Sequence, residues 1–193
     1  GISQPATGWL RAACRWHTTL VDRIVSAPKP DDPLAREDPL LAVAEPFALW
    51  LIDRSPDVPG LMRHPAVQAV DALGPYYLRK VRILNGAHPA LVAKALPLGF
   101  ETVRQAVEDA EIGAWLRRLL FEEIVPVVAD RTESAEEFAR ATLERFANPF
   151  LDHRLADIAL HHDVKLRTRL VPTYEEYRQR FGRAPRRLGD VLP

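Results

Sequence analysis

Hydrophobic and polar positions follow two different patterns along the chain. In the first third, short apolar runs alternate with stretches rich in proline and aspartate, and two of these runs, residues 19–25 and 47–53, are bounded by turn-forming residues. Short runs of this kind predict strands. From about residue 64 the apolar positions recur with helical spacing instead. The pattern therefore predicts a helical part preceded by a small mixed α/β part.

Several helices of the second part can be placed from their boundaries and apolar stripes. Ser134 with Glu137, and Thr173 with Glu176, have the spacing of a capping box at a helix N-terminus. Pro89 is expected to kink or divide the helix in which it lies. An apolar stripe at positions i, i+4, i+7, i+8 and i+12 predicts a further amphipathic helix. Its members are Ile112, Leu116, Leu119, Leu120 and Ile124.

Composition and charge narrow the class of protein. The 193 residues suffice for one domain with a sizeable core, or for one domain and part of another. Lys+Arg and Asp+Glu both number 26, so the net charge of zero gives no electrostatic argument for nucleic-acid binding. No apolar run approaches the roughly 20 residues that span a bilayer. We therefore expect neither nucleic acid nor a membrane among the partners.

Cysteine and histidine usage gives no support for a metal site or a disulfide. Cys14 is the single cysteine, which excludes an internal disulfide and a cysteine-based zinc site. Its thiol has no identifiable activating partner and is expected to be inert, and a reduced, cytoplasmic setting fits best. His161, His162 and Asp163 are metal-ligand types, but no further well-spaced ligand accompanies them, so we expect no metal.

Residues 80–90, KVRILNGAHPA, combine a core-like helix with three polar groups that cost free energy to bury without partners. At 100° per residue, Lys80, Asn85 and His88 project from one side of a helix within an arc of roughly 140°. An amine, an amide and an imidazole can together handle an oxygenated substrate, because they donate and accept protons and hydrogen bonds. From spacing alone, a structural role is the more frequent explanation: a surface lysine, a loop-bonded asparagine and a satisfied core histidine.

The order K-x4-N-x2-H within RKVRILNGAHPALV resembles the catalytic signature of the polyol-specific long-chain dehydrogenases, the mannitol dehydrogenase and hexuronate reductase family. Within that family the chain is most similar to the tagaturonate reductase (altronate oxidoreductase) branch, because polyol members tend to carry proline where Arg167 stands and arginine where Asp157 stands. Further stretches resemble the family in the same order, so the resemblance covers nearly the whole chain. These are HTTLVDRIV (17–25), LAVAEPFALWLID (41–53) and the segments 99–128 and 145–172.

The resemblance implies a mainly α fold. Residues 66–193 would form a helical substrate domain like the C-terminal domain of 6-phosphogluconate dehydrogenase. Residues 1–65 would be a small mixed α/β tail of the dinucleotide-binding domain. The chain has no G-x-G-x-x-G turn, so the Rossmann core is expected to be missing from it. On its own the chain is therefore expected to be inactive and to bind NAD poorly.

The resemblance also implies an activity, the NAD-dependent and metal-free interconversion of tagaturonate, a keto-hexuronate, and altronate. Fructuronate reductase and mannitol 2-dehydrogenase are alternatives within the family. In this reading Lys80 is the general acid and base, Asn85 stabilises the developing oxyanion, and His88 binds a substrate hydroxyl. A non-catalytic helical module that binds a ligand or partner, and has lost its cofactor domain, is the alternative of another class.

Further residues match substrate-binding positions of the family. Lys165 matches a second substrate-binding lysine, and Asp22 matches an aspartate at the cleft. The carboxylate of a hexuronate calls for a cation, and we expect Arg167 or Arg169 to provide it, because arginine binds carboxylates in a bidentate manner. The alternatives are an ordinary ion pair between Asp22 and Arg23, and a solvated basic helix end that carries the two arginines.

Overall fold

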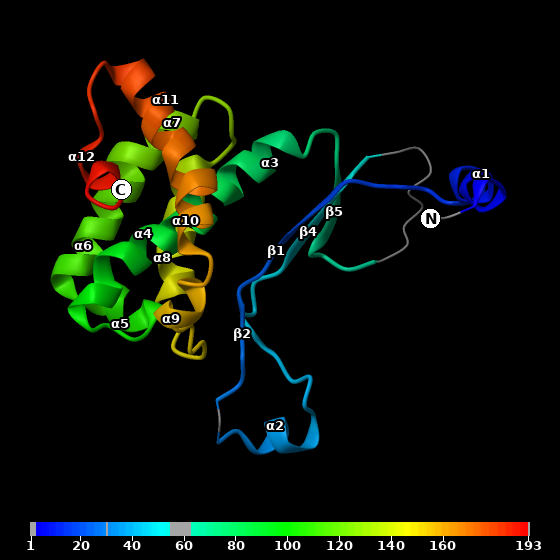
Figure 1. Ribbon diagram of the computed structural model, residues 1–193, viewed down its shortest axis with the longest axis horizontal. Coiled ribbons are helices and arrows are strands. Elements are labelled where there is room, and N and C mark those ends of the chain that lie inside the picture. The colour runs from blue at the N-terminus through cyan, green and yellow to red at the C-terminus, as the bar shows by residue number, and fades with distance from the viewer. Residues whose placement is uncertain (1–2, 30, 55–62, 193) are drawn as a thin grey trace. The chain divides into compact units, whose positions relative to one another are not determined.

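The computed structural model describes residues 3–29, 31–54 and 63–192, which belong to two compact units (Figure 1). The first unit is built from the described residues up to Asp22 and between Ala48 and Gly74. The second unit contains the segment Arg23–Phe47 and the chain from Pro75 onward. The expected division into a cofactor-domain tail at 1–65 and a substrate domain at 66–193 stays a prediction.

The described residues of the first unit form a three-stranded sheet and one helix, and they contain strands at both places where the sequence predicts them. In the sheet order β1-β4-β5, β1 is antiparallel to β4 and β4 is parallel to β5. The side chain of Leu51 in β4 is fully buried. The elements are α1 (Gln4–Ala13), β1 (Thr19–Asp22), β4 (Leu49–Asp53) and β5 (Val67–Val70).

Strand β5 lies where the helical part was expected to have begun. The main-chain N–H of Trp50 donates to Ala66 at 2.7 Å, and the N–H of Arg54 donates to Val70 at 2.7 Å. These hydrogen bonds come from a strand distant in sequence, so the local pattern around residue 67 does not reveal them. The first helix of the helical part begins at Gly74 instead.

In the second unit, a segment before the helices is tied to them by a buried ion pair. Strands β2 (Val25–Ser26) and β3 (Val43–Ala44) pair in antiparallel fashion on either side of α2 (Pro33–Glu37). The Glu45 carboxylate accepts hydrogen bonds from the Ile24 N–H at 2.6 Å and from Nη2 of Arg145 at 2.7 Å. Glu45 is 1% exposed and the Arg145 side chain 8% exposed, so this pair is removed from water.

Helices form the rest of the second unit, and the predicted mainly α fold with a small mixed part is confirmed. Three of the elements are π-helical turns, labelled η1, η3 and η4, and η2 is a 3-10 turn. The elements are α3 (Gly74–Arg79), η1 (Lys80–Leu84), α4 (Asn85–Ala95), η2 (Leu96–Leu98), α5 (Val103–Glu108), α6 (Ala110–Arg118), η3 (Leu119–Ile124), α7 (Val125–Val128), α8 (Ala135–Phe146), α9 (Leu155–Ile158), α10 (His162–Lys165), η4 (Leu166–Leu170), α11 (Val171–Phe181) and α12 (Arg186–Gly189).

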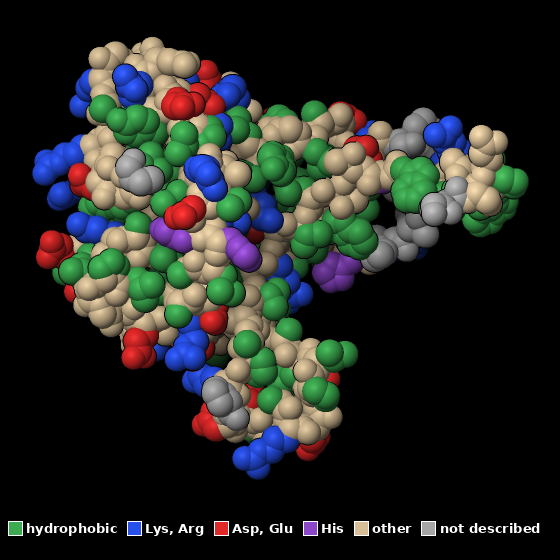
Figure 2. Space-filling model, in the orientation of Figure 1, with side chains coloured by type: hydrophobic (Ala, Val, Ile, Leu, Met, Phe, Trp, Pro, Cys, Tyr) green, Lys and Arg blue, Asp and Glu red, His purple; other side chains and the backbone are tan. Residues whose placement is uncertain are grey.

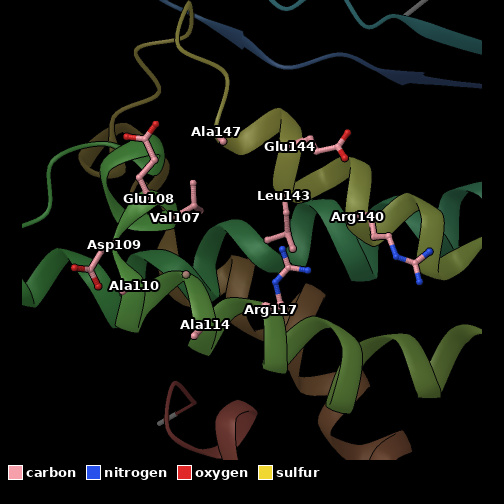
Figure 3. A pocket seen from close by; sticks show the side chains of 11 residues that line it. Val107, Glu108, Asp109, Ala110, Ala114, Arg117, Arg140, Leu143, Glu144 and Ala147 are labelled. Atoms are coloured by element: carbon pink, nitrogen blue, oxygen red, sulfur yellow. The ribbon is translucent and has the colours of Figure 1, made fainter.

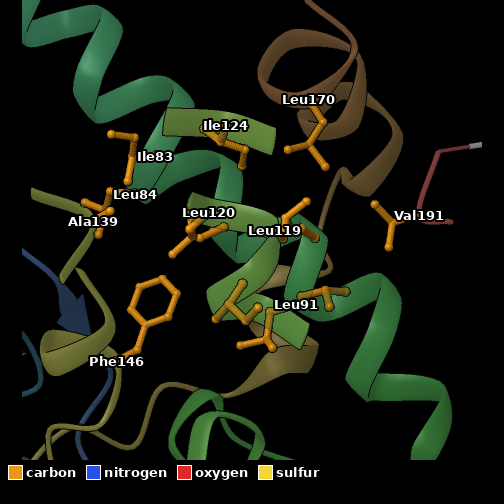
Figure 4. Packing of buried hydrophobic residues seen from close by; sticks show 14 of the residues in the cluster. Ile83, Leu84, Leu91, Leu119, Leu120, Ile124, Ala139, Phe146, Leu170 and Val191 are labelled. Carbon is orange, nitrogen blue, oxygen red and sulfur yellow. The ribbon is translucent and has the colours of Figure 1, made fainter. Parts of the chain in front are cut away.

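Helix α4 lies in the middle of the other helices and contacts α5, α6, α9, α10 and η4. Eight of its residues are buried, because small and apolar side chains occur on all sides of the helix. The predicted stripe of residues 112–124 is buried as expected. Figure 4 shows its members Leu119, Leu120 and Ile124 beside Ile83 and Leu91.

The three π-helical turns in the described part of the chain are each followed by a proline within five residues: Pro89, Pro126 and Pro172. A proline has no N–H and crowds the carbonyl four residues before it, which disturbs α-helical hydrogen bonding upstream. Pro89 was expected to kink or divide its helix. Instead α4 runs through it to Ala95, and the departure from α geometry lies in η1, upstream of the proline.

Neither predicted capping box forms. Ser134 has a left-handed backbone (φ 51°), and its side chain caps nothing. Thr173 lies inside α11, which begins at Val171 directly after η4, and Thr173 accepts a hydrogen bond from Arg82 instead. A capping box does form at α5, between Thr102 and Gln105.

No described helix is both long and apolar enough to cross a bilayer. Acidic and basic side chains are scattered among one another over the visible surface (Figure 2).

Candidate active site

A cavity of about 430 Å³ in the second unit brings together three of the predicted site residues, His88, Lys165 and Arg169. They come from α4, from the end of α10 and from η4. The other lining residues are Val25, Ser26, Ala27, His153, Asp157 and Ile158.

His88 is a buried, neutral imidazole with one ring nitrogen left for a ligand. The residue is 7% exposed, and its Nε2 atom has no hydrogen-bond partner among the described residues. Burial, and then the neighbouring His153 and Arg169, hold the pKa of His88 well below its usual range. A neutral imidazole has one donor and one acceptor nitrogen, so Nε2 can bond a ligand hydroxyl in either role at neutral pH.

Two cations share the cavity and form no ion pair with any described carboxylate. Lys165 donates from Nζ to the Ile158 carbonyl at 2.6 Å, and Arg169 donates from Nη1 to the Asn85 carbonyl at 3.1 Å. Burial, and then the charge of Arg169, lower the pKa of Lys165. Burial also lowers the pKa of Arg169, which nonetheless keeps its charge.

Unsatisfied polar atoms in the cavity indicate a polar ligand. Besides Nε2 of His88, the buried hydroxyl of Ser26 has no hydrogen-bond partner in the described part of the chain. Buried polar atoms in native proteins are nearly always hydrogen-bonded, so two such atoms in one cavity call for an explanation. A polyhydroxylated anion would satisfy both atoms and pair with the cations.

The π-helical turn η1 explains the spacing of Lys80, Asn85 and His88. The N–H of Asn85 donates to the Lys80 carbonyl, which is the i to i+5 bond of a π-helix. One helical turn therefore separates Lys80 from Asn85, and a further three residues of α4 separate Asn85 from His88. The three positions follow one side of the helix more closely than the α-helical arc of 140° suggests. Lys80 is half-buried; neither it nor Asn85 is among the residues that line the cavity.

The arginines on either side of Lys80 anchor this turn. Arg79 donates to the Glu133 carbonyl at 2.9 Å. Arg82 pairs with Glu176 of α11 at 2.7 Å and donates to Thr173 at 2.8 Å. These contacts hold η1 against α11 and the loop before α8.

Of the two arginines that were expected to bind the substrate carboxylate, the structure places one in the cavity and one outside it. Arg169 lines the cavity, whereas Arg167 is exposed and is not part of the lining. Asp22 belongs to the first unit, where it ends β1 opposite Leu49. Substrate-binding roles for Asp22 and Arg167 stay predictions.

Residues 72–188, more than half of the chain, match the family described as the mannitol dehydrogenase C-terminal domain. The chain belongs to this family. Among its relatives is an altronate oxidoreductase of Bacillus subtilis (strain 168), 39% identical over 198 residues that cover 97% of the chain and 41% of the relative. An altronate oxidoreductase of Klebsiella pneumoniae (strain 342) is 40% identical over 201 residues, 99% of the chain and 42% of the relative. The chain thus spans about two fifths of the length of these relatives, and the predicted resemblance is confirmed.

Solved structures show the same fold. Mannitol 2-dehydrogenase of Pseudomonas fluorescens, in a ternary complex with NAD and D-mannitol, superposes with a TM-score of 0.75 at 22% identity, over 95% of this chain and 39% of that one. A substrate-free D-sorbitol dehydrogenase superposes with a TM-score of 0.71 at 24% identity, over 88% and 37%. At this identity the likeness establishes the fold of the mannitol dehydrogenase C-terminal domain and no more.

Sequence reasoning missed His153 and Asp157 as site residues. The His153 ring lies 5.0 Å from that of His88, and burial is the main cause that lowers the pKa of His153. Asp157 is exposed at the rim, and its charge acts in the opposite direction on His153. No motif marks His153, and the sequence analysis uses Asp157 only to distinguish branches of the family; α4 and the segment that carries both residues meet only in the folded chain.

Two other candidate sites in the described residues, a second cavity and a cluster of metal ligands, give no comparable active site. A second cavity, between α5, α6 and α8, is lined by side chains of mixed charge that include Glu108, Arg117 and Arg140 (Figure 3). Within the described residues, no three His, Cys, Asp or Glu side chains gather as metal ligands. The absence of a metal from the whole protein stays a prediction.

The lowered pKa of His88 predicts a loss of stability in acid. As the pH falls below about 6.5, the unfolded chain binds a proton that the folded chain refuses, so the free energy of unfolding decreases. Urea denaturation between pH 7.5 and 5.5 measures this slope. His88→Gln is expected to reduce the slope, whereas His161→Asn, at an exposed position with a left-handed backbone, is expected to leave it unchanged. Equal slopes in the wild type and in His88→Gln would contradict the prediction.

Proposed function

We propose that this chain is the substrate-binding, C-terminal part of an NAD-dependent oxidoreductase that interconverts tagaturonate and altronate. The observation that carries the proposal is the cavity, where two cations without carboxylate partners among the described residues and the unpartnered Nε2 of His88 match a sugar acid. A neutral polyol would leave both cations without a counter-charge. The two relatives named altronate oxidoreductase support the same substrate class.

The cofactor would be bound mainly by a domain that is not part of this chain. The sequence has no glycine-rich dinucleotide turn, and relatives extend well beyond the matched region. When bound there, NADH supplies the hydride for the substrate carbon. We assign residues 1–65 to the tail of that domain, and we expect the whole protein to work in the cytoplasm without a metal.

The residues of this chain would manage the proton and orient the substrate. During reduction the carbonyl carbon gains the hydride, and the Lys80 ammonium gives a proton to the carbonyl oxygen, which becomes the hydroxyl of altronate. In the oxidative direction the Lys80 amine takes that proton back. The Asn85 amide donates a hydrogen bond to the developing oxyanion, and Nε2 of His88 forms one with a neighbouring hydroxyl. Lys165 and Arg169 pair with the carboxylate at the other end of the sugar.

An assay with an enzyme that joins this chain to an N-terminal cofactor domain of an altronate oxidoreductase tests the proposal. The oxidation of NADH is followed with tagaturonate, fructuronate and fructose in turn. We expect the highest kcat/KM with tagaturonate and no turnover by the 193-residue chain alone. Equal kcat/KM for fructose would remove the carboxylate-binding role. If no ketose reacts although NADH binds, the non-catalytic module becomes the better explanation.

A further inference from the structure

We propose that His153 is a substrate-binding residue of this site: together with His88 it holds two neighbouring hydroxyls of the sugar acid and thereby distinguishes tagaturonate from its epimer fructuronate. The inference rests on the proposed function for the identity of the ligand. His153 lies outside the K-x4-N-x2-H signature, so only the folded chain brings it to the site.

The backbone around His153 is fixed against the start of α5. The His153 carbonyl accepts a hydrogen bond from the N–H of Val103 at 2.9 Å, and the N–H of Leu155 donates to the Glu101 carbonyl at 2.9 Å. An antiparallel bridge lies between these two bonds. The ring of His153 is therefore carried by a backbone that is bonded on both sides, and such support holds a binding side chain in a defined place.

The ring of His153 lines the cavity beside the ring of His88. The two ring centres are 5.0 Å apart and the ring planes are inclined at 65°, so one imidazole meets the other with its edge. Phe146 also packs against the His88 ring, with the ring centres 4.4 Å apart. Two imidazoles held at this separation can each form a hydrogen bond to one of two neighbouring hydroxyls along a sugar chain.

The ring nitrogens of His153 form no hydrogen bond with the described residues. Burial is the main cause that lowers the pKa of His153; the charges of Asp157 and Glu45 oppose this effect, and that of Lys165 adds to it. The ring is thus neutral at neutral pH and has one donor and one acceptor nitrogen. A hydroxyl also donates and accepts, so it suits such a ring, whereas a carboxylate suits the cations Lys165 and Arg169.

Two adjacent imidazoles can distinguish the two sugar acids, because tagaturonate and fructuronate differ only in the configuration of one hydroxyl-bearing carbon. In one epimer both hydroxyls meet a ring, whereas in the other epimer one hydroxyl turns away and leaves a ring nitrogen unpaired. A binding site rejects a ligand that leaves its buried polar groups unpaired. The cations cannot make this distinction, since both sugars carry the same carboxylate.

His153→Phe, in the enzyme that joins this chain to a cofactor domain, tests the proposal. Phenylalanine keeps an aromatic ring beside His88 but has no nitrogen that can form a hydrogen bond. We expect the KM for tagaturonate to rise about 3–10-fold, the size of one neutral hydrogen bond, and the ratio of kcat/KM for tagaturonate over fructuronate to fall by a similar factor. The kcat for tagaturonate should stay close to that of the wild type, because the lost contact is one of binding.

His153→Gln and His162→Phe are the controls. Glutamine has a donor and an acceptor, so His153→Gln should keep more of the discrimination between the epimers than His153→Phe does. His162 is half-buried and has a lowered pKa like His153, but it does not line the cavity. His162→Phe is therefore expected to leave both KM values unchanged.

An unchanged KM and an unchanged epimer ratio in His153→Phe would overturn the proposal while leaving the proposed function intact. An equal loss of discrimination in His153→Gln would also overturn it, because ring packing alone would then explain the effect. His153→Leu gives a second variant without a hydrogen-bonding atom if the phenylalanine variant does not fold. Calorimetric titration with altronate measures binding without turnover. If altronate binds the wild type more tightly than His153→Phe but no hexuronate is turned over, the binding role stands and the proposed function fails.

Discussion

Replacing Lys80 with alanine is expected to lower kcat for tagaturonate reduction by about 10²–10⁴-fold, the usual contribution of a positioned general acid. Without the ammonium, the developing alkoxide has to take its proton from water. The affinity for NADH is expected to stay unchanged, because the cofactor is assigned to another domain. Steady-state kinetics with the enzyme that contains this chain and its cofactor domain would measure both values.

Lys94→Ala is the matched control for Lys80. Lys94 lies further along α4, is half-buried like Lys80, and has its ammonium 5.7 Å from the centre of the Trp115 ring, outside the cavity lining. We expect its kcat to stay within about twofold of the wild type, since it has no part in proton transfer. A Lys80→Ala enzyme that keeps most of its activity would eliminate Lys80 as the acid and base.

Glu45→Ala is expected to lower the free energy of unfolding of the second unit by about 3–5 kcal/mol, as the loss of one partner of a buried ion pair does. The substitution leaves the charge of Arg145 buried without the Glu45 carboxylate and removes the acceptor of the Ile24 N–H. Urea denaturation measures the loss. The KM for substrate should also rise, because Glu45 holds the segment whose residues Val25 and Ser26 line the cavity.

The exposed pair between Glu136 and Arg140 provides the control for the buried one. Its side chains are 60% and 53% exposed, so Glu136→Ala is expected to cost about 0.5 kcal/mol or less. In addition, the double variant Glu45→Met/Arg145→Met should be more stable than either single variant, because it removes both charges of the buried pair. Similar losses for Glu45→Ala and Glu136→Ala would show that burial adds nothing to the pair.

The sequence predicts the helical class and much of the core because these depend on periodicity. The stripe from Ile112 to Ile124 is buried although its last part is a π-helical turn. The capping boxes at Ser134 and Thr173 fail because a cap depends on where the helix begins, and that is set by η4 at one site and by a left-handed residue at the other. Strand β5 could not be predicted, since its hydrogen bonds come from β4.

The candidate site, like the fold, could be predicted from the sequence only in part. Resemblance and spacing select Lys80, Asn85 and His88. In a regular α-helix, however, these side chains would project over a wide arc. The π-helical turn that aligns Lys80 with Asn85 has no simple sequence signature. Lys165, expected from the resemblance, and Arg169, expected as a cation for the carboxylate, both line the cavity. The location of His153 beside His88 depends on tertiary packing, which no local pattern encodes.

The central claim is that the cavity binds the carboxylate end of a sugar acid while Lys80, outside the cavity lining, serves its reacting carbon. A crystal structure of the enzyme with altronate tests this most directly. We predict the carboxylate within hydrogen-bond distance of Arg169 and Lys165, one hydroxyl on Nε2 of His88, and the reacting hydroxyl on the ammonium of Lys80. A bound altronate with its carboxylate away from both cations, or its reacting hydroxyl away from Lys80, would contradict the account.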